Sequence, residues 1–235
     1  MPKIALFVEG QAEQIFIREM LLRRFAYNAD DLQICCLRLV AEKLESAEYD
    51  YGKENALNHF LVINAGNDNK VLSVMLRRHA GLISKGYQMI IGLRDMYSKF
   101  YREQSASVVN QELNKEIISA ARQQIKDKNV ANVKIHFAIM EVETWMLALL
   151  DKWKGALSKD DISKYFNSDC NLEEIFHPSE VVKSLTGISG PPYDKHSSQV
   201  NSIMANISWE DYRTLYRSNR CPSFNLFLDD LNIMQ

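Results

Sequence analysis

Short apolar runs alternate with amphipathic segments from the start of the chain to about residue 157, and this alternation constrains the fold most. Five runs have the pattern of buried strands: "KIALFV" (3–8), "LQICCLRLV" (32–40), "HFLVINA" (59–65), "YQMIIGLRD" (87–95) and "NVKIHFAIM" (132–140). Continuous apolar runs are typical of strands that helices cover on both faces. Helical spacing predicts helices over 11–26, 70–84, 105–128 and 141–157. The sequence therefore predicts an α/β fold with a mainly parallel sheet flanked by helices.

The remainder of the chain has only helical patterns. Helices are predicted over 179–185, 198–207, 209–216 and 223–231. A chain of 235 residues with 46% hydrophobic residues can bury one sizeable core and still carry an appendage. We predict an α/β core over 1–157 and a mostly helical C-terminal extension over 158–235 that packs on it.

The net charge and the hydropathy of the chain limit the kinds of partner that it is expected to bind. A formal net charge of -2 argues against a protein held to nucleic acid by bulk positive charge, so such a partner must be bound in a local groove. No stretch approaches the roughly 20 apolar residues of a membrane helix. Glu9 interrupts the first apolar run before it reaches the length of a signal peptide's apolar region. We expect a cytoplasmic protein that has no contact with a membrane.

Acidic residues follow three of the predicted strands. Glu9 comes after the first strand, Asp95 ends the fourth, and Glu141 and Glu143 follow the fifth. In an open parallel sheet, reactive groups collect beyond the carboxyl ends of the strands. Clustered carboxylates repel one another unless a cation lies among them, and oxygen ligands of this kind suit Mg²⁺ or Mn²⁺. The alternative is that Glu9 and Glu141 are acids at helix starts, stabilised by the helix dipole.

Several motifs carry a family resemblance. "LFVEGQAEQIFI" resembles the opening of the TOPRIM (topoisomerase-primase) domain, in which a strand ends in a glutamate followed by glycine. "IIGLRDMY" resembles the strand with that fold's paired aspartates. The segments "MEVETWMLAL", "PPYDK" and "CPSFNLFLDDL" resemble motifs of a bacterial family of unknown function with a TOPRIM-like fold. That family is related to the nuclease domains of overcoming-lysogenization-defect proteins.

The resemblance implies a TOPRIM-like fold and roles for individual residues. It implies that Glu9 transfers a proton or binds metal, that Asp95 binds metal, and that Lys195 stabilises charge on a phosphate. Tyr97 stands where TOPRIM enzymes have their second aspartate, and a tyrosine cannot replace a carboxylate ligand at neutral pH. One of the two glutamates after the fifth strand would supply the missing ligand.

These features together predict a metal-dependent nuclease or phosphoryl-transfer protein that acts on DNA or RNA. The resemblance implies a role in phage defence or DNA repair beside a partner ATPase. The segment "NAGNDNKV" (64–71) lacks the Gly-Lys-Ser/Thr signature of a phosphate-binding loop, so a partner would have to supply any ATP hydrolysis. A second copy of the chain, in a homodimer, is a further candidate partner. The alternatives are a non-catalytic TOPRIM-like module that binds a partner protein or nucleic acid, and a phosphotransfer enzyme for small molecules.

Overall fold

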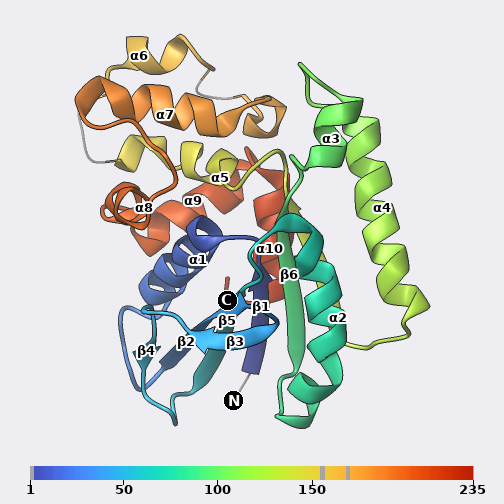
Figure 1. The fold of residues 1–235 in the computed structure, drawn as a ribbon. Helices are drawn as coiled ribbons and strands as arrows, with labels where there is room; N and C mark the ends of the chain where they lie inside the picture. Colours follow the sequence, from blue (N-terminus) through green and yellow to red (C-terminus); the bar gives the residue numbers. More distant parts are fainter. Residues whose placement is uncertain (1–2, 154–156, 168–169, 235) are drawn as a thin grey trace. The chain divides into compact units, whose positions relative to one another are not determined.

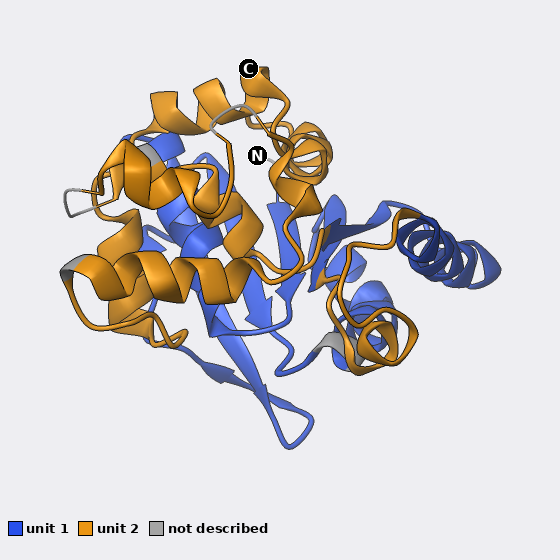
Figure 2. Cartoon of the chain, turned by 90° about the horizontal axis from the view of Figure 1, so that it is seen from above, with its two compact units in different colours: residues 1–94, 112–137 blue, residues 95–111, 138–235 orange. Residues whose placement is uncertain are grey.

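The computed structural model describes residues 3–153, 157–167 and 170–234 (Figure 1). The chain divides into two compact units, shown in different colours in Figure 2. The first comprises residues 1–94 and 112–137, and the second comprises 95–111 and 138–235. The predicted boundary between residues 157 and 158 falls inside the second unit, and its assignment as a domain boundary stays a prediction.

The strands form a seven-stranded sheet with the order β3-β2-β5-β1-β6-β7, with β4 paired to β2. Strand β1 is parallel to β5 and β6, and β2 is parallel to β5, whereas β3 and β4 run antiparallel to β2. The prediction of an α/β fold with a mainly parallel sheet is confirmed. The bounds are β1 (Lys3–Val8), β2 (Leu32–Val40), β3 (Lys43–Ser46), β4 (Tyr51–Gly52), β5 (Asn58–Asn64), β6 (Met89–Asp95) and β7 (Val133–Ala138).

Strands β3 and β4 have no counterpart in the predicted elements. Both are short, and most of their residues are exposed or half-buried. They therefore lack the apolar pattern by which the five longer strands are recognised.

Helices of the first unit cover the sheet. Those that contact the strands are α1 (Gln11–Arg24) and α2 (Asp68–Ser84), and α4 (Gln111–Asp127) lies in the connection between β6 and β7. The connections through α1 and α2 run in opposite directions along the sheet, so right-handed crossovers place these helices on opposite sides of the strands, as Figure 1 shows. Gly92 in β6 permits close packing, because a Cβ there would lie 3.2 Å from Met75 of α2 and 2.6 Å from Ile135 of β7.

The predicted helix over 105–128 is wrong at its start. A separate helix, α3 (Lys99–Gln104), precedes it, and α4 begins only at Gln111. Ser105 does not cap α4, because it ends α3 and its hydroxyl donates to the carbonyl of Val108 at 2.7 Å. Serine's ability to bond to nearby backbone is thus used in a turn rather than in a helix cap.

The predicted helix over 141–157 does not continue past Leu147, and its residues 154–156 lie outside the described part of the chain. The structure has α5 (Glu143–Leu147) and a 3₁₀ turn, η1 (Leu150–Lys152). The carbonyl of Met146 accepts from the backbone N–H of Leu149 at 3.1 Å and from the indole N–H of Trp153 at 3.2 Å. A continuing α-helix would use that carbonyl for the residue four positions on, so the helix tightens and ends here.

The second unit is mainly helical. The four helices predicted after residue 157 are present as α7 (Pro178–Ser189), α8 (Ser197–Met204), α9 (Trp209–Ser218) and α10 (Pro222–Leu231), together with the short α6 (Lys159–Ser163) and the 3₁₀ turn η2 (Leu172–Glu174). Across the described part of the chain, no helix has the length and apolarity needed to cross a membrane.

Trp145 anchors the core of the second unit. It is completely buried, and its ring centroid lies 5.2 Å from that of Phe224 and 5.5 Å from that of Phe227. Its indole N–H donates to the hydroxyl of Ser223 at 3.0 Å, so the polar edge of the ring is satisfied. This packing joins α5, which carries Glu143, to α10.

Candidate metal centre

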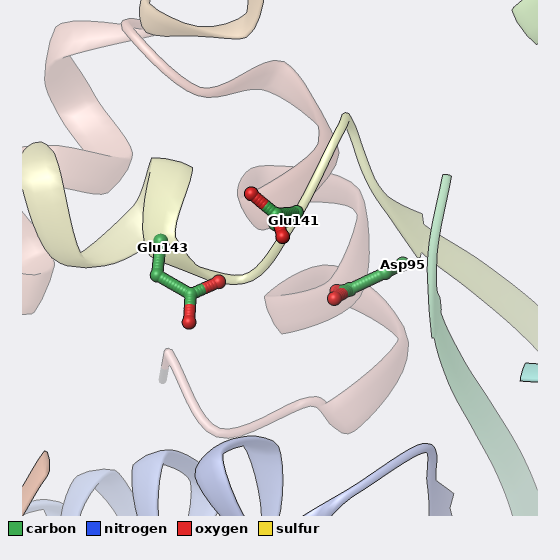
Figure 3. A group of neighbouring side chains, drawn as sticks. All are labelled: Asp95, Glu141 and Glu143. Carbon is green, nitrogen blue, oxygen red and sulfur yellow. The ribbon is translucent and has the colours of Figure 1, made fainter. Parts of the chain in front are cut away.

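Three predicted site residues gather in the second unit. Asp95 is the last residue of β6, and Glu141 and Glu143 follow β7, the neighbouring strand. Each offers a carboxylate oxygen, and these three atoms lie within 4.8 Å of one another (Figure 3). All three side chains are buried. The expectation that acids at adjacent strand ends converge is therefore confirmed for these residues.

Asp95 is held by the chain that leaves β7. The pairing of the two strands continues past their ends, because the backbone N–H of Tyr97 donates to the carbonyl of Met140 at 2.8 Å. Oδ1 of Asp95 then accepts from the backbone N–H of Val142 at 2.9 Å. This bond satisfies a backbone donor at the start of α5 and fixes the orientation of the carboxylate.

Glu141 is held by the start of another helix. Its Oε2 accepts from the backbone N–H of Ser179, in the first turn of α7, at 3.2 Å. The positive end of the helix dipole stabilises a carboxylate in this position. The other oxygen, Oε1, accepts from Nζ of Lys195 at 3.1 Å.

Glu143 is the most deeply buried of the three acids. It has no exposed surface, and its Oε1 accepts from the hydroxyl of Tyr193 at 2.8 Å. Nζ of Lys195 lies 3.3 Å from Oε1 and 3.4 Å from Oε2. Burial raises the pKa of Glu143 above its ordinary value and Glu141 adds to the rise, although the Lys195 ammonium opposes it.

Lys195 brings the positive charge to the cluster. Its side chain is 44% exposed, and its ammonium contacts Glu141 and Glu143 together. The backbone at Lys195 is left-handed, with φ +66°, a conformation that non-glycine residues rarely adopt and that costs on the order of 1 kcal/mol. Three carboxylates and one ammonium leave the ionised cluster with an excess of negative charge, which is the condition for attracting a cation.

Glu9 lies in the first unit, half-buried, directly after β1, and its assignment to the site stays a prediction. Gly10, the N-cap of α1, has extended backbone with φ -145° rather than a left-handed turn. Its N–H donates to Oε2 of Glu13 at 2.9 Å, and a Cβ at Gly10 would lie 3.0 Å from that oxygen. Gly10 thus leaves room for the carboxylate of Glu13, a buried residue.

Tyr97 occupies an aromatic cluster in the second unit. Its ring contacts those of Tyr101, Phe176 and His177 at centroid distances of 6.2, 5.7 and 5.0 Å. The guanidinium of Arg102 lies 5.8 Å from its centroid, a cation–π contact. The residue at this position therefore contributes packing, and the two glutamates after β7 provide the carboxylates that accompany Asp95.

Sequence reasoning did not single out two of the groups that organise the site. The hydroxyl of Tyr193 and the backbone N–H of Ser179 each hold one glutamate. Tyr193 stands two residues before Lys195 in the quoted segment "PPYDK", so the motif contained it. The contact of Ser179 is a backbone bond from a distant helix, and no side-chain pattern reveals it.

The fold and this site define an α/β protein with a buried carboxylate cluster and an associated lysine at the carboxyl ends of two neighbouring strands. The family described as "Domain of unknown function (DUF4276)" matches residues 8–232, and the chain belongs to that family. No curated protein and no solved structure matches the chain.

Proposed function

We propose that this protein is a divalent-metal-dependent hydrolase that cleaves phosphodiester bonds in DNA or RNA. The observation that carries the proposal is the clustering of Asp95, Glu141 and Glu143, whose ligand atoms lie within 4.8 Å of one another with the ammonium of Lys195 beside them. Buried carboxylates at this separation are costly without a cation, and phosphate chemistry needs positive charge.

The donor set fits Mg²⁺ or Mn²⁺. All three side chains offer oxygen, which hard divalent cations prefer, and the cluster contains no sulfur or imidazole ligand among the described residues. Asp95, Glu141 and Glu143 would hold the ion. When bound, such an ion neutralises charge on phosphate oxygens and lowers the pKa of a water molecule.

The protein's own groups prepare this site in distinct ways. Val142 N–H, Ser179 N–H and Tyr193 O–H each hold one oxygen of a carboxylate, which orients the ligands before an ion binds. Lys195 is long, partly exposed and already adjacent to the carboxylates. Once an ion balances those carboxylates, the ammonium is placed to stabilise charge on a phosphate oxygen.

The TOPRIM resemblance adds a cellular compartment, a biological role and a partner to this proposal. A nuclease of this kind would act in the cytoplasm, in phage defence or DNA repair, with a partner ATPase supplying ATP hydrolysis. The resemblance also gives Glu9 a role in proton transfer or metal binding.

The test is calorimetric titration with MgCl₂ and MnCl₂, followed by assays on labelled DNA and RNA oligonucleotides. Asp95→Asn and Glu143→Gln should abolish saturable metal binding and metal-dependent cleavage. Glu180→Gln is the matched control, because Glu180 is an exposed acid on α7 that pairs with Lys183 at 3.7 Å. Cleavage that persists in EDTA, or metal binding unchanged in both site variants, would exclude this function.

A second candidate is a non-catalytic module that binds a partner protein or nucleic acid. The favouring observation is that Lys195 contacts both glutamates, so the cluster already has a cation of its own. In that case the wild-type protein binds no divalent metal, even when an oligonucleotide is present. Lys195→Met then lowers the stability of the protein, and added metal does not restore it.

A further inference from the structure

A cavity in the second unit adjoins the carboxylate cluster. Its volume is about 380 Å³, within the range of small-molecule sites. Trp153, Leu185 and Tyr193 contribute aromatic and aliphatic walls, and Ser198 and Ser202 of α8 contribute hydroxyl groups. None of the described residues that line it carries a charge. A neutral, flat and partly apolar group suits such a cavity, whereas an ionised group would be poorly solvated there.

Tyr193 belongs to both sites. It is one of the residues that line the cavity, and its hydroxyl donates to Oε1 of Glu143 at 2.8 Å. The cavity and the carboxylate cluster are therefore separated by no more than the span of one tyrosine residue. In a nucleotide, the sugar separates the flat neutral base from the charged phosphate on the same scale.

The cavity wall is built from a firmly held loop. The backbone N–H of Tyr193 donates to the hydroxyl of Thr186 at 2.9 Å, and that hydroxyl donates to the carbonyl of Val182 in α7 at 2.9 Å. From the other side, Gln199 of α8 donates to the carbonyl of Pro192 at 2.8 Å. Both helices thus hold the backbone of the loop at Pro192 and Tyr193, so this wall is formed in advance of any ligand.

We infer that this cavity binds one base of the nucleic-acid substrate while the adjoining phosphate lies at the carboxylate cluster. The inference rests on the proposed function and adds a base-binding subsite to it. Stacking on an aromatic side chain is worth about 1–3 kcal/mol per base and tolerates every base, because each has a π-face. The hydroxyls of Ser198 and Ser202 supply donors and acceptors for the edge of the base.

Two small ligands isolate the contribution of the base. Adenosine 5′-monophosphate and ribose 5-phosphate share the sugar and the phosphate, and only the first has a base. With Mg²⁺ present, we expect the full-length protein to bind adenosine 5′-monophosphate about 5-fold or more tightly than ribose 5-phosphate. The measurement is calorimetry, supported by quenching of tryptophan fluorescence.

A pair of variants on α8 tests the location. Ser202→Phe fills part of the cavity and should bring the affinity ratio of the two ligands close to one. Asn201→Phe places the same bulk on the same helix at an exposed position that is not among the described lining residues, and should leave the ratio unchanged. Circular dichroism of both variants establishes that they are folded.

The outcomes separate this inference from the proposed function. Equal binding of the two ligands by the wild type, or a ratio that Ser202→Phe does not lower, overturns the base subsite even where metal-dependent cleavage is observed. No binding of either adenosine 5′-monophosphate or adenosine overturns it as well. In a further outcome, Ser202→Phe abolishes the binding of adenosine, whereas neither Mg²⁺ nor Asp95→Asn changes the affinity for adenosine 5′-monophosphate. That result supports the base-binding cavity and counts against the proposed hydrolase.

Discussion

Replacing Lys195 with methionine tests the electrostatics of the cluster directly. The substitution keeps a long apolar stem and removes the ammonium that contacts Glu141 and Glu143. The two glutamates, whose side chains are 12% and 0% exposed, then remain without this cation. We expect the metal-free variant to be less stable than the wild type and to recover stability when Mg²⁺ is added.

The magnitude follows from the distances. At the separations of 3.1 and 3.3 Å, Coulomb's law gives about 1 kcal/mol per contact with the dielectric constant of water and about 5 kcal/mol with an effective value of 20. The Lys195 side chain is 44% exposed, so solvent screening places the interaction near the lower figure. The two contacts together therefore stabilise the metal-free protein by about 2 kcal/mol. A loss of that size lowers Tm by about 4–8 °C for a chain of this length.

The assay is thermal unfolding in EDTA and at increasing MgCl₂, followed by circular dichroism. Since Lys195 and the metal ion compete for the same carboxylates, its removal should also tighten Mg²⁺ binding by about 30-fold, the equivalent of 2 kcal/mol. Lys183→Met is the control, because the exposed pair of Lys183 with Glu180 predicts a change within about 0.5 kcal/mol. An unchanged Tm in EDTA, or Mg²⁺ affinity equal to that of the wild type, would refute this account of the cluster.

Three further predictions concern groups around the site and in the sheet. Tyr193→Phe removes the donor to buried Glu143 and should cost about 2 kcal/mol in a urea titration, with no effect on the ratio of base-bearing to base-free ligand; an unchanged midpoint would contradict it. Burial raises the pKa of Glu173 above its ordinary 4.5, so the folded protein holds this proton more tightly and its stability falls as pH rises from 4.5 through the raised value. As the pH rises through this range, Glu173→Gln should therefore become more stable relative to the wild type. Free energies of unfolding that change with pH in parallel in the two proteins would contradict this prediction. Gly92→Ala brings a Cβ within 2.6 Å of Ile135 and should destabilise the protein by about 1–3 kcal/mol, measured by denaturant unfolding; a neutral effect would show that the neighbouring side chains give way.

The fold was predictable because its signal is local. Each long strand is a run of apolar residues, and each crossover helix has its apolar residues at helical spacing. The acids of the site were predictable for the same reason, since Asp95, Glu141 and Glu143 directly end or follow such runs. The parallel topology then brings the ends of β6 and β7 together, as the neighbouring positions of these strands in the sheet require.

The remaining features depend on contacts that are distant in sequence. Strands β3 and β4 owe their existence to pairing with β2 rather than to apolar residues of their own. The shortening of the predicted helix over 141–157 comes from the Trp153 indole, which competes for a backbone carbonyl. Such competition between a side chain and the helix ladder is decided by tertiary packing, and propensity cannot reveal it.

The way in which the carboxylates are held helps to explain how the folded protein tolerates their burial. Glu141 and Glu143 each direct one oxygen to a fixed donor of the second unit, and both approach the ammonium of Lys195. The fixed donors repay part of the cost of burial and set the direction of each side chain, whereas the cation is a partly exposed group. A purely structural ion pair does not require ligands that are held so firmly beside a partly exposed cation. A metal site gains a great deal, because the ligands stay oriented while one cation replaces another, and this asymmetry between rigid anions and a replaceable cation is the strongest physical reason to look for metal-dependent chemistry here.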